Sequence, residues 1–156
     1  MGSFGAKNVI IFIGDGLGIA PTVAARIYKG QQEGSPNGGE EAELLWETFP
    51  YAAFSKTYNV DHQVPDSAGT ATAIFSGVKT RMAVLGIDNQ VAYNTCDASG
   101  IEKRKLKSML HKAVDDNKAT GIVTTTRLTH ATPGALYAHI QNREWVNILL
   151  CILIVS

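Results

Sequence analysis

A serine with an acidic neighbour is the clearest candidate nucleophile in this chain. Asp66 and Ser67 follow Pro65 and precede a run of small residues, Ala-Gly-Thr-Ala-Thr-Ala, at positions 68–73. A helix that begins here would direct its first amide N–H groups and the positive end of its dipole at the Ser67 oxygen. That environment favours the ionised hydroxyl that nucleophilic catalysis requires. An Asp-Ser pair before a helix also serves as a simple N-cap, so both interpretations stay open on this pattern alone.

Two other polar clusters contain residue types that bind ions. Asp15 stands within Gly-Asp-Gly-Leu-Gly at positions 14–18, and the spacing does not fit a dinucleotide-binding G-x-G-x-x-G motif. An acid at this place would repel a pyrophosphate and suits a bound cation. A turn aspartate that bonds to local backbone is an equal alternative. His130 and Thr132 form the other cluster, although a single histidine is more often structural.

The chain alternates segments typical of strands with segments typical of helices. Strands are predicted at residues 8–13, 52–58 and 121–126, because each is rich in β-branched or aromatic side chains. Caps, prolines and apolar spacing predict helices at residues 20–32, 67–77 and 106–114, and one that begins near Pro133. This order predicts an α/β fold with a central parallel sheet and helices on both faces. Strand ends gather at one edge of such a sheet, where Asp15, Ser67 and the His130/Thr132 pair would converge.

Two histidines are expected to have ordinary surroundings. In the helix at residues 106–114, apolar residues recur on one face, which predicts a buried stripe and leaves His111 on the wet face with the lysines. His62 lies close to Ser67 in the sequence and invites assignment as its base. A polar loop histidine near a turn is more commonly solvated, and we interpret His62 in that way.

The composition is that of a globular protein and excludes some functions. The chain has 156 residues, of which 45% are hydrophobic and 18% charged, and its formal net charge is zero. No basic stripe interleaves with aromatic residues, so no nucleic-acid partner is expected. Cys96 and Cys151 are too few for a disulfide framework. The apolar segment at residues 146–156 is too short to span a membrane, and is interpreted either as a buried strand or as a chain that stops before its natural end.

Taken together, the three clusters resemble the alkaline phosphatase family. The resemblance is carried by residues 14–18, by residues 64–73 around Ser67, and by residues 129–133 followed by Ala138-His139 and Asn142-Arg143. It runs from about residue 7 to residue 145, and His130, where bacterial members often carry an acid, suggests the animal branch. The resemblance implies an alkaline-phosphatase-like α/β fold and phosphomonoester hydrolysis at alkaline pH with two zinc ions and one magnesium ion. It also implies extracellular or cell-surface localisation and a homodimer.

The resemblance assigns roles to individual residues. Ser67 would be the nucleophile that is transiently phosphorylated while zinc holds its oxygen. Asp15 would touch that zinc and the magnesium, and His130 and Thr132 would lie on the magnesium side. Arg143 would grip the phosphate, with Asp66 orienting it. A guanidinium fork fits two phosphate oxygens and stays charged at alkaline pH, in agreement with this role.

Other features depart from the family pattern. By this resemblance, we expect the family's remaining zinc ligands, its magnesium glutamate, its signal peptide and its membrane anchor to have no counterpart in this sequence. We also expect no partner for Cys96, which stands where animal members place a disulfide cysteine. We therefore expect residues 1–145 to be an N-terminal portion of the enzyme, residues 146–156 to be a divergent tail, and turnover to be weak or absent. The alternative is a non-catalytic fragment that associates with a full-length subunit or a membrane through this tail. A serine acyl hydrolase is excluded, because its G-x-S-x-G motif would need glycine where Pro65 stands.

Overall fold

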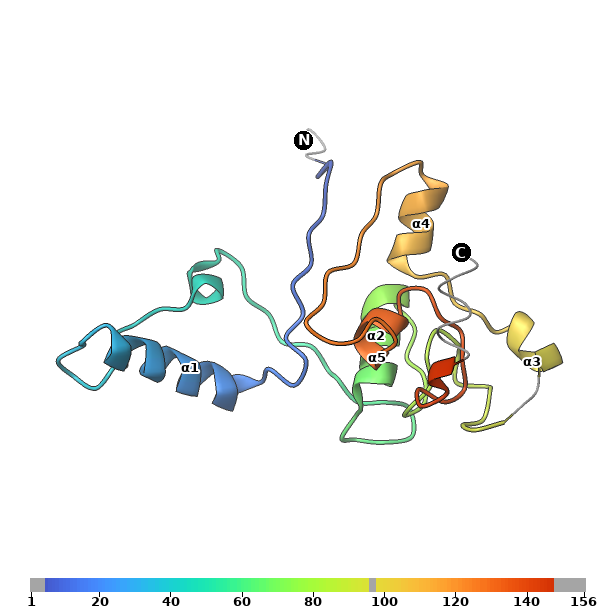
Figure 1. Ribbon diagram of the computed structural model, residues 1–156, viewed down its shortest axis with the longest axis horizontal. Helices are drawn as coiled ribbons and strands as arrows, with labels where there is room; N and C mark the ends of the chain where they lie inside the picture. The colour runs from blue at the N-terminus through green and yellow to red at the C-terminus, as the bar shows by residue number, and fades with distance from the viewer. Residues whose placement is uncertain (1–4, 96–97, 148–156) are drawn as a thin grey trace. The chain divides into compact units, whose positions relative to one another are not determined.

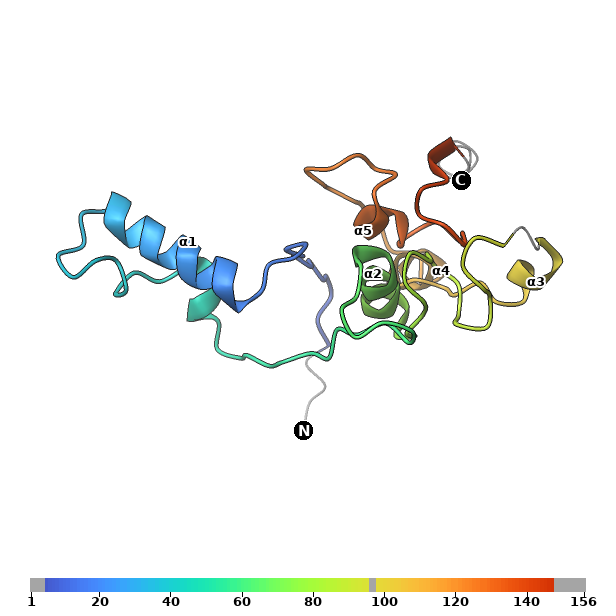
Figure 2. The ribbon, with the colours of Figure 1, turned by 90° about the horizontal axis from the view of Figure 1, so that it is seen from below.

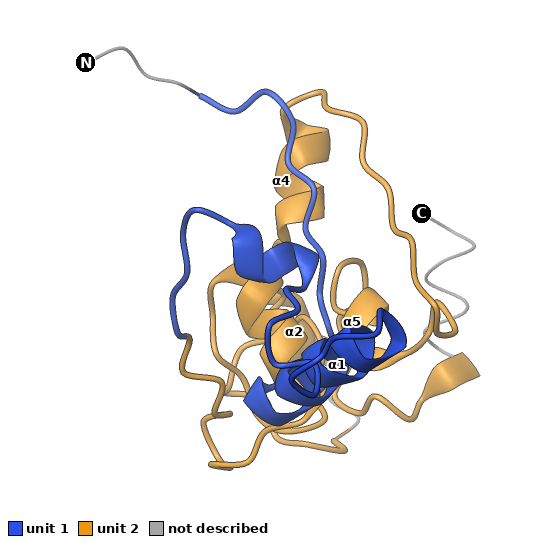
Figure 3. Cartoon of the chain, turned by 90° about the vertical axis from the view of Figure 1, so that its left-hand side faces the viewer, with its two compact units in different colours: residues 1–54 blue, residues 55–156 orange. Residues whose placement is uncertain are grey.

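The structure, a computed structural model, describes residues 5–95 and 98–147. Residues 148–156 of the apolar tail and both cysteines lie outside the described residues. The chain divides into two compact units, residues 1–54 and 55–156, which Figure 3 colours separately. Within the described residues, none of the helices combines the length and apolar character needed to cross a membrane.

The first unit contains one long helix and the segment that returns along it. Helix α1 (Ile19–Gln32) starts after Gly18 and carries Pro21 in its first turn, as predicted. The short 3₁₀ helix η1 (Leu45–Thr48) follows a polar loop. Arg26 of α1 forms an ion pair of 2.6 Å with Glu47 of η1, and this contact ties the two helices together.

The second unit is built around helix α2 (Ser67–Ser76), which agrees with the predicted helix at residues 67–77. It packs against α5 (Ala131–Gly134) and α4 (Met109–Asp115), as Figures 1 and 2 show. Helix α3 (Ala98–Glu102) lies between α2 and α4 in the sequence. Ala68, Ala71 and Phe75 of α2 enter a core that also contains Leu85 and Ile140. The backbones of Leu85 and Ile140 exchange two hydrogen bonds of 2.9 Å, which join the loop after α2 to the chain after α5.

The predicted strands at residues 8–13, 52–58 and 121–126 are not formed. Pairing within the described residues is limited to three isolated bridges, and in Figure 1 all three segments run as plain coil. Phe12, Phe54 and Val123 are 91%, 96% and 102% exposed, so these apolar segments are uncovered. A strand has free N–H and C=O groups on both sides, and it is stable only when neighbouring strands pair with them. The central parallel sheet is therefore not confirmed and stays a prediction.

Helix α4 differs from its predicted amphipathic pattern. Met109 and Leu110 pack against the core, but Val114, the second-last residue of the helix, is 58% exposed. His111 is half-buried and not on a fully wet face, so that prediction was wrong. The cause is the cap at Ser108, whose hydroxyl lies 2.8 Å from Nδ1 of His111 and draws the ring toward the helix start.

His139 is expected to make stability depend on pH in the mildly acidic range. Burial lowers the pKa of His139, a backbone hydrogen bond with Leu106 opposes this, and the charges of His111 and Lys105 lower it further. The unfolded chain therefore takes up a proton below roughly pH 6.5, the ordinary histidine pKa, while folded His139 still resists it. The free energy of unfolding should fall as the pH drops through that value and level off below the folded pKa.

Urea unfolding at a series of pH values, compared between the native chain and His139→Gln, checks this expectation. The glutamine variant should lose the histidine-dependent part of the slope. His62→Gln is the control, because it replaces an exposed histidine whose Nδ1 is paired with Asp61 at 3.1 Å; the slope due to His139 should persist there. Equal slopes in the native and His139→Gln chains would contradict the assignment.

Candidate active site

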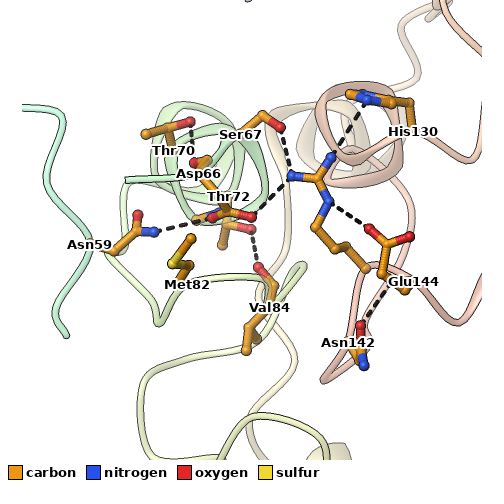
Figure 4. Close-up of polar contacts among 12 residues, drawn as sticks. Asn59, Asp66, Ser67, Thr70, Thr72, Met82, Val84, His130, Asn142 and Glu144 are labelled. Carbon is orange, nitrogen blue, oxygen red and sulfur yellow. Dashed lines mark hydrogen bonds and ion pairs between the residues drawn. The ribbon is translucent and has the colours of Figure 1, made fainter. Parts of the chain in front are cut away.

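The side chain of Arg143 joins Ser67, Asp66 and His130 in the second unit (Figure 4). Its Nη1 group donates to Ser67 Oγ at 2.9 Å and to Asp66 Oδ2 at 3.1 Å. Its Nη2 group lies 3.5 Å from His130 Nε2, and its Nε group lies 3.4 Å from Glu144 Oε1. Arg143 is 19% exposed and Asp66 11% exposed, so this ion pair is largely shielded from water. The guanidinium therefore places a fixed positive charge beside the serine hydroxyl.

Helix α2 positions the two residues at its N-terminus. Asp66 is the N-cap, with its carboxylate oxygen Oδ1 accepting the backbone N–H of Gly69 at 3.0 Å. Ser67 is the first residue of the helix and is half-buried. Because Asp66 makes the cap, the Ser67 hydroxyl is not used for capping and contacts Arg143 instead. The structure therefore gives the cap to Asp66, and the nucleophilic role of Ser67 stays a prediction.

Asp66 is ionised in this setting. Burial raises the pKa of its carboxyl group, but hydrogen bonds from the backbone of Gly69 and Ala83 and from the side chains of Arg143 and Asn59 lower it by more. The pKa of Asp66 therefore lies below its ordinary value. A carboxylate that keeps its charge can both hold Arg143 in place and balance its charge.

Arg143 is held by the chain that surrounds it. Its backbone N–H donates to the carbonyl of Ala83 at 2.9 Å, close to the bridge between Leu85 and Ile140. The neighbouring Asn142 is buried, accepts the N–H of Glu144 at 2.9 Å and donates to the side chain of Asn94 at 3.0 Å. These contacts fix the direction from which the guanidinium approaches α2.

His130 and Thr132 lie on the short helix α5. His130 is its N-cap, and the Nδ1 atom of His130 is buried and has no hydrogen-bond partner in the described part of the chain. Thr132 is the second residue of α5 and is half-buried. Both residues thus belong to the same unit as Ser67. His130 is linked to Ser67 through Arg143, which contacts both side chains.

Asp15 belongs to the first unit and is described within that unit alone. It is exposed, and it lies in a turn closed by a hydrogen bond of 3.1 Å from the N–H of Leu17 to the carbonyl of Gly14. Gly16 makes this turn possible, since it adopts a φ of +72°.

The described residues do not by themselves form a metal centre. No group of three or more His, Cys, Asp or Glu residues is placed to hold an ion within the ranges 5–95 and 98–147. Zinc prefers four nitrogen, sulfur or carboxylate ligands.

The sequence analysis missed two residues that contact the site, Asn59 and Glu144, because neither belongs to a recognisable motif. Glu144 follows Arg143 directly, but nothing in the pattern marked Asn59.

Comparison with known proteins gives a consistent result. A sequence model of the family described as Alkaline phosphatase matches residues 6–151. The chain is 51% identical over 140 residues to "Alkaline phosphatase 4" of Drosophila melanogaster, and 49% identical over 140 residues to the human "Alkaline phosphatase, tissue-nonspecific isozyme". Both alignments cover 90% of this chain but only 22% and 26% of the relatives, so the chain spans about a quarter of their length.

A solved structure extends this similarity to the fold. The cold-active alkaline phosphatase of the psychrophile Shewanella sp. superposes with a TM-score of 0.73 at 26% identity, over 90% of this chain and 32% of that one. The agreement supports an alkaline-phosphatase-like fold.

Proposed function

The chain belongs to the alkaline phosphatase family of phosphoric monoester hydrolases, and we propose that it supplies the nucleophile and the phosphate-binding arginine of such a site. The observation that carries this proposal is the shared contact of Arg143, whose Nη1 group donates to both Ser67 and Asp66. A serine at a helix N-terminus beside a shielded guanidinium has the surroundings that nucleophilic attack on a phosphate ester requires.

In the proposed reaction, Ser67 Oγ attacks the phosphorus of the monoester. A bond forms between Oγ and phosphorus, the bond from phosphorus to the ester oxygen breaks, and the alcohol leaves with the proton that Ser67 gives up through solvent. Water then attacks the phosphoserine, which releases inorganic phosphate and restores the hydroxyl. Arg143 holds two phosphate oxygens during both steps, since its fork can donate from two nitrogens at once. Asp66 keeps the guanidinium directed at the serine.

We further propose zinc and magnesium as cofactors, by family resemblance. The structure of a variant of the TAB5 alkaline phosphatase, 32% identical over 65% of this chain at a TM-score of 0.55, is described with Mg bound. The contributions from this chain would be Asp15, Ser67, His130 and Thr132. The buried Nδ1 of His130 and the Thr132 hydroxyl suit a site of mixed nitrogen and oxygen ligands, but they do not complete one.

Further proposals concern the setting of the whole protein. Small phosphomonoesters are the proposed substrates, a homodimer the proposed assembly, and the cell surface or extracellular space the proposed location. All three follow from the family alone.

A hybrid enzyme tests the proposed function. Residues 6–145 of this chain would replace the matching segment of the Drosophila relative, and both the hybrid and the 156-residue chain would be assayed with p-nitrophenyl phosphate, zinc and magnesium. We expect the hybrid to hydrolyse the ester and the 156-residue chain to show little or no turnover, because the described residues lack a metal-binding group. A folded, metal-loaded but inactive hybrid would refute the proposed function. Robust turnover by the 156-residue chain would refute the second expectation.

A further inference from the structure

Asn59 is a buried polar residue that reaches the site from outside the motif around Ser67. It is 3% exposed, and its side-chain Nδ2 group donates to Asp66 Oδ1 at 3.1 Å. In Figure 4, Asn59 and His130 lie on opposite sides of Asp66. The amide therefore contacts the carboxylate oxygen that Arg143 does not contact.

The two oxygens of the Asp66 carboxylate have different side-chain partners, and the backbone N–H of Ala83 also donates to the carboxylate. Oδ1 accepts from Asn59 and from the backbone N–H of Gly69, at 3.1 and 3.0 Å. Oδ2 accepts from Arg143 Nη1 at 3.1 Å. Two donors on Oδ1 restrict rotation of the carboxylate, and this keeps Oδ2 directed at the guanidinium.

Asn59 is itself fixed by backbone contacts and by the shape of α2. Its backbone exchanges two hydrogen bonds with His62, at 3.0 and 3.3 Å, in a tight turn. Its side chain lies against Gly69, where an added Cβ would overlap the Asn59 amide. The glycine in the first turn of α2 therefore leaves the space through which the amide reaches Asp66.

We propose that Asn59 is a positioning residue for Arg143, acting through Asp66 to hold the guanidinium beside Ser67. The chain of contacts runs from the Asn59 amide to Asp66 Oδ1, and from Asp66 Oδ2 to Arg143 Nη1, which also contacts Ser67 Oγ. The inference rests on the proposed role of Arg143 as the phosphate-binding group. Gly69 contributes to this arrangement, because its lack of a side chain leaves room for the Asn59 amide.

Nitrogen NMR of the Arg143 guanidinium in the 156-residue chain tests this proposal directly. In the native chain the guanidinium is held at Nη1, Nη2 and Nε, so it should rotate slowly and give two separate Nη signals. The signals that disappear in Arg143→Lys belong to Arg143. Asn59→Leu fills the space without a donor, and Gly69→Ala pushes the amide away. Each variant should merge the Nη signals and weaken the binding of inorganic phosphate about tenfold, the effect of one charge-assisted hydrogen bond. The double variant should add little, since both changes break the same contact.

Thr72→Val is the matched control. Thr72 is buried in the same helix, and its hydroxyl accepts the N–H of Gly86 at 3.0 Å and donates to the carbonyl of Val84 at 3.5 Å. This variant should lose stability and yet keep the separate Nη signals. The proposal is overturned if both Asn59→Leu and Gly69→Ala keep the native Nη signals. If Asn59→Leu does not fold, native Nη signals in Gly69→Ala are enough to overturn it. A native chain that shows separate signals but binds no phosphate would refute the proposed role of Arg143 and still decide that of Asn59.

Discussion

Ser67→Ala in the hybrid enzyme is expected to lower kcat for p-nitrophenyl phosphate by about a thousandfold or more, because no other group replaces the nucleophile. The fold should be almost unaffected. Asp66, and not Ser67, caps α2, and alanine is a better helix former than serine. The free energy of unfolding should therefore change by less than about 0.5 kcal/mol. Large loss of activity without loss of stability is the signature of a catalytic group.

Ser76→Ala is the matched control for this experiment. Ser76 is the last residue of the same helix, and its hydroxyl donates to the carbonyl of Thr72 at 2.7 Å, away from Arg143. Activity should stay within a few fold of the unmodified hybrid. A direct readout is acid quenching during turnover with labelled phosphate ester, which should leave the label on Ser67. Label on another residue, or Ser67→Ala with undiminished kcat, would contradict the assignment.

Helices α1 and α2 could be predicted from local sequence, and the sheet could not be established in the same way. Helix α1 begins after Gly18 and carries Pro21 in its first turn, and α2 ends at the glycine that caps it, so the signals lie next to the elements they define. Strand pairing depends instead on residues distant in the sequence. The segments at residues 8–13 and 121–126 have strand composition, but the described residues supply no neighbour for them. Composition alone therefore does not make a strand.

The candidate site shows the same division between local and distant information. The Asp-Ser pair, the His130 segment and Arg143 could be found from motifs because each lies in a short, unusual sequence. Asn59 and Asp66 meet only because a tight turn folds Asn59 back over the start of α2. Contacts of this kind depend on loop geometry, which residue types do not determine. His111 is a further case, since its position follows from the Ser108 cap and not from apolar spacing.

Arg143→Ala is expected to have two separable effects. In the hybrid enzyme, the loss of the fork should lower kcat/KM by about 10²- to 10³-fold, the usual cost of removing a donor to developing charge. In the 156-residue chain, the variant should also lose on the order of 3 kcal/mol of stability, because the shielded Asp66 carboxylate is left without its cation. Arg143→Lys keeps the charge but not the fork, so it should recover stability more fully than activity.

A second substitution at Asp66 separates the two effects of Arg143→Ala. Asp66→Asn removes the uncompensated charge and keeps an amide oxygen to accept the N–H of Gly69, so the double variant should regain stability in urea unfolding. It should not regain activity, because the phosphate oxygens still lack their donors. If the double variant recovered both, Arg143 would be needed only to neutralise Asp66, and the phosphate-binding role would be wrong. Recovery of stability alone would establish that the ion pair holds the arginine in place and that the guanidinium itself serves the reaction.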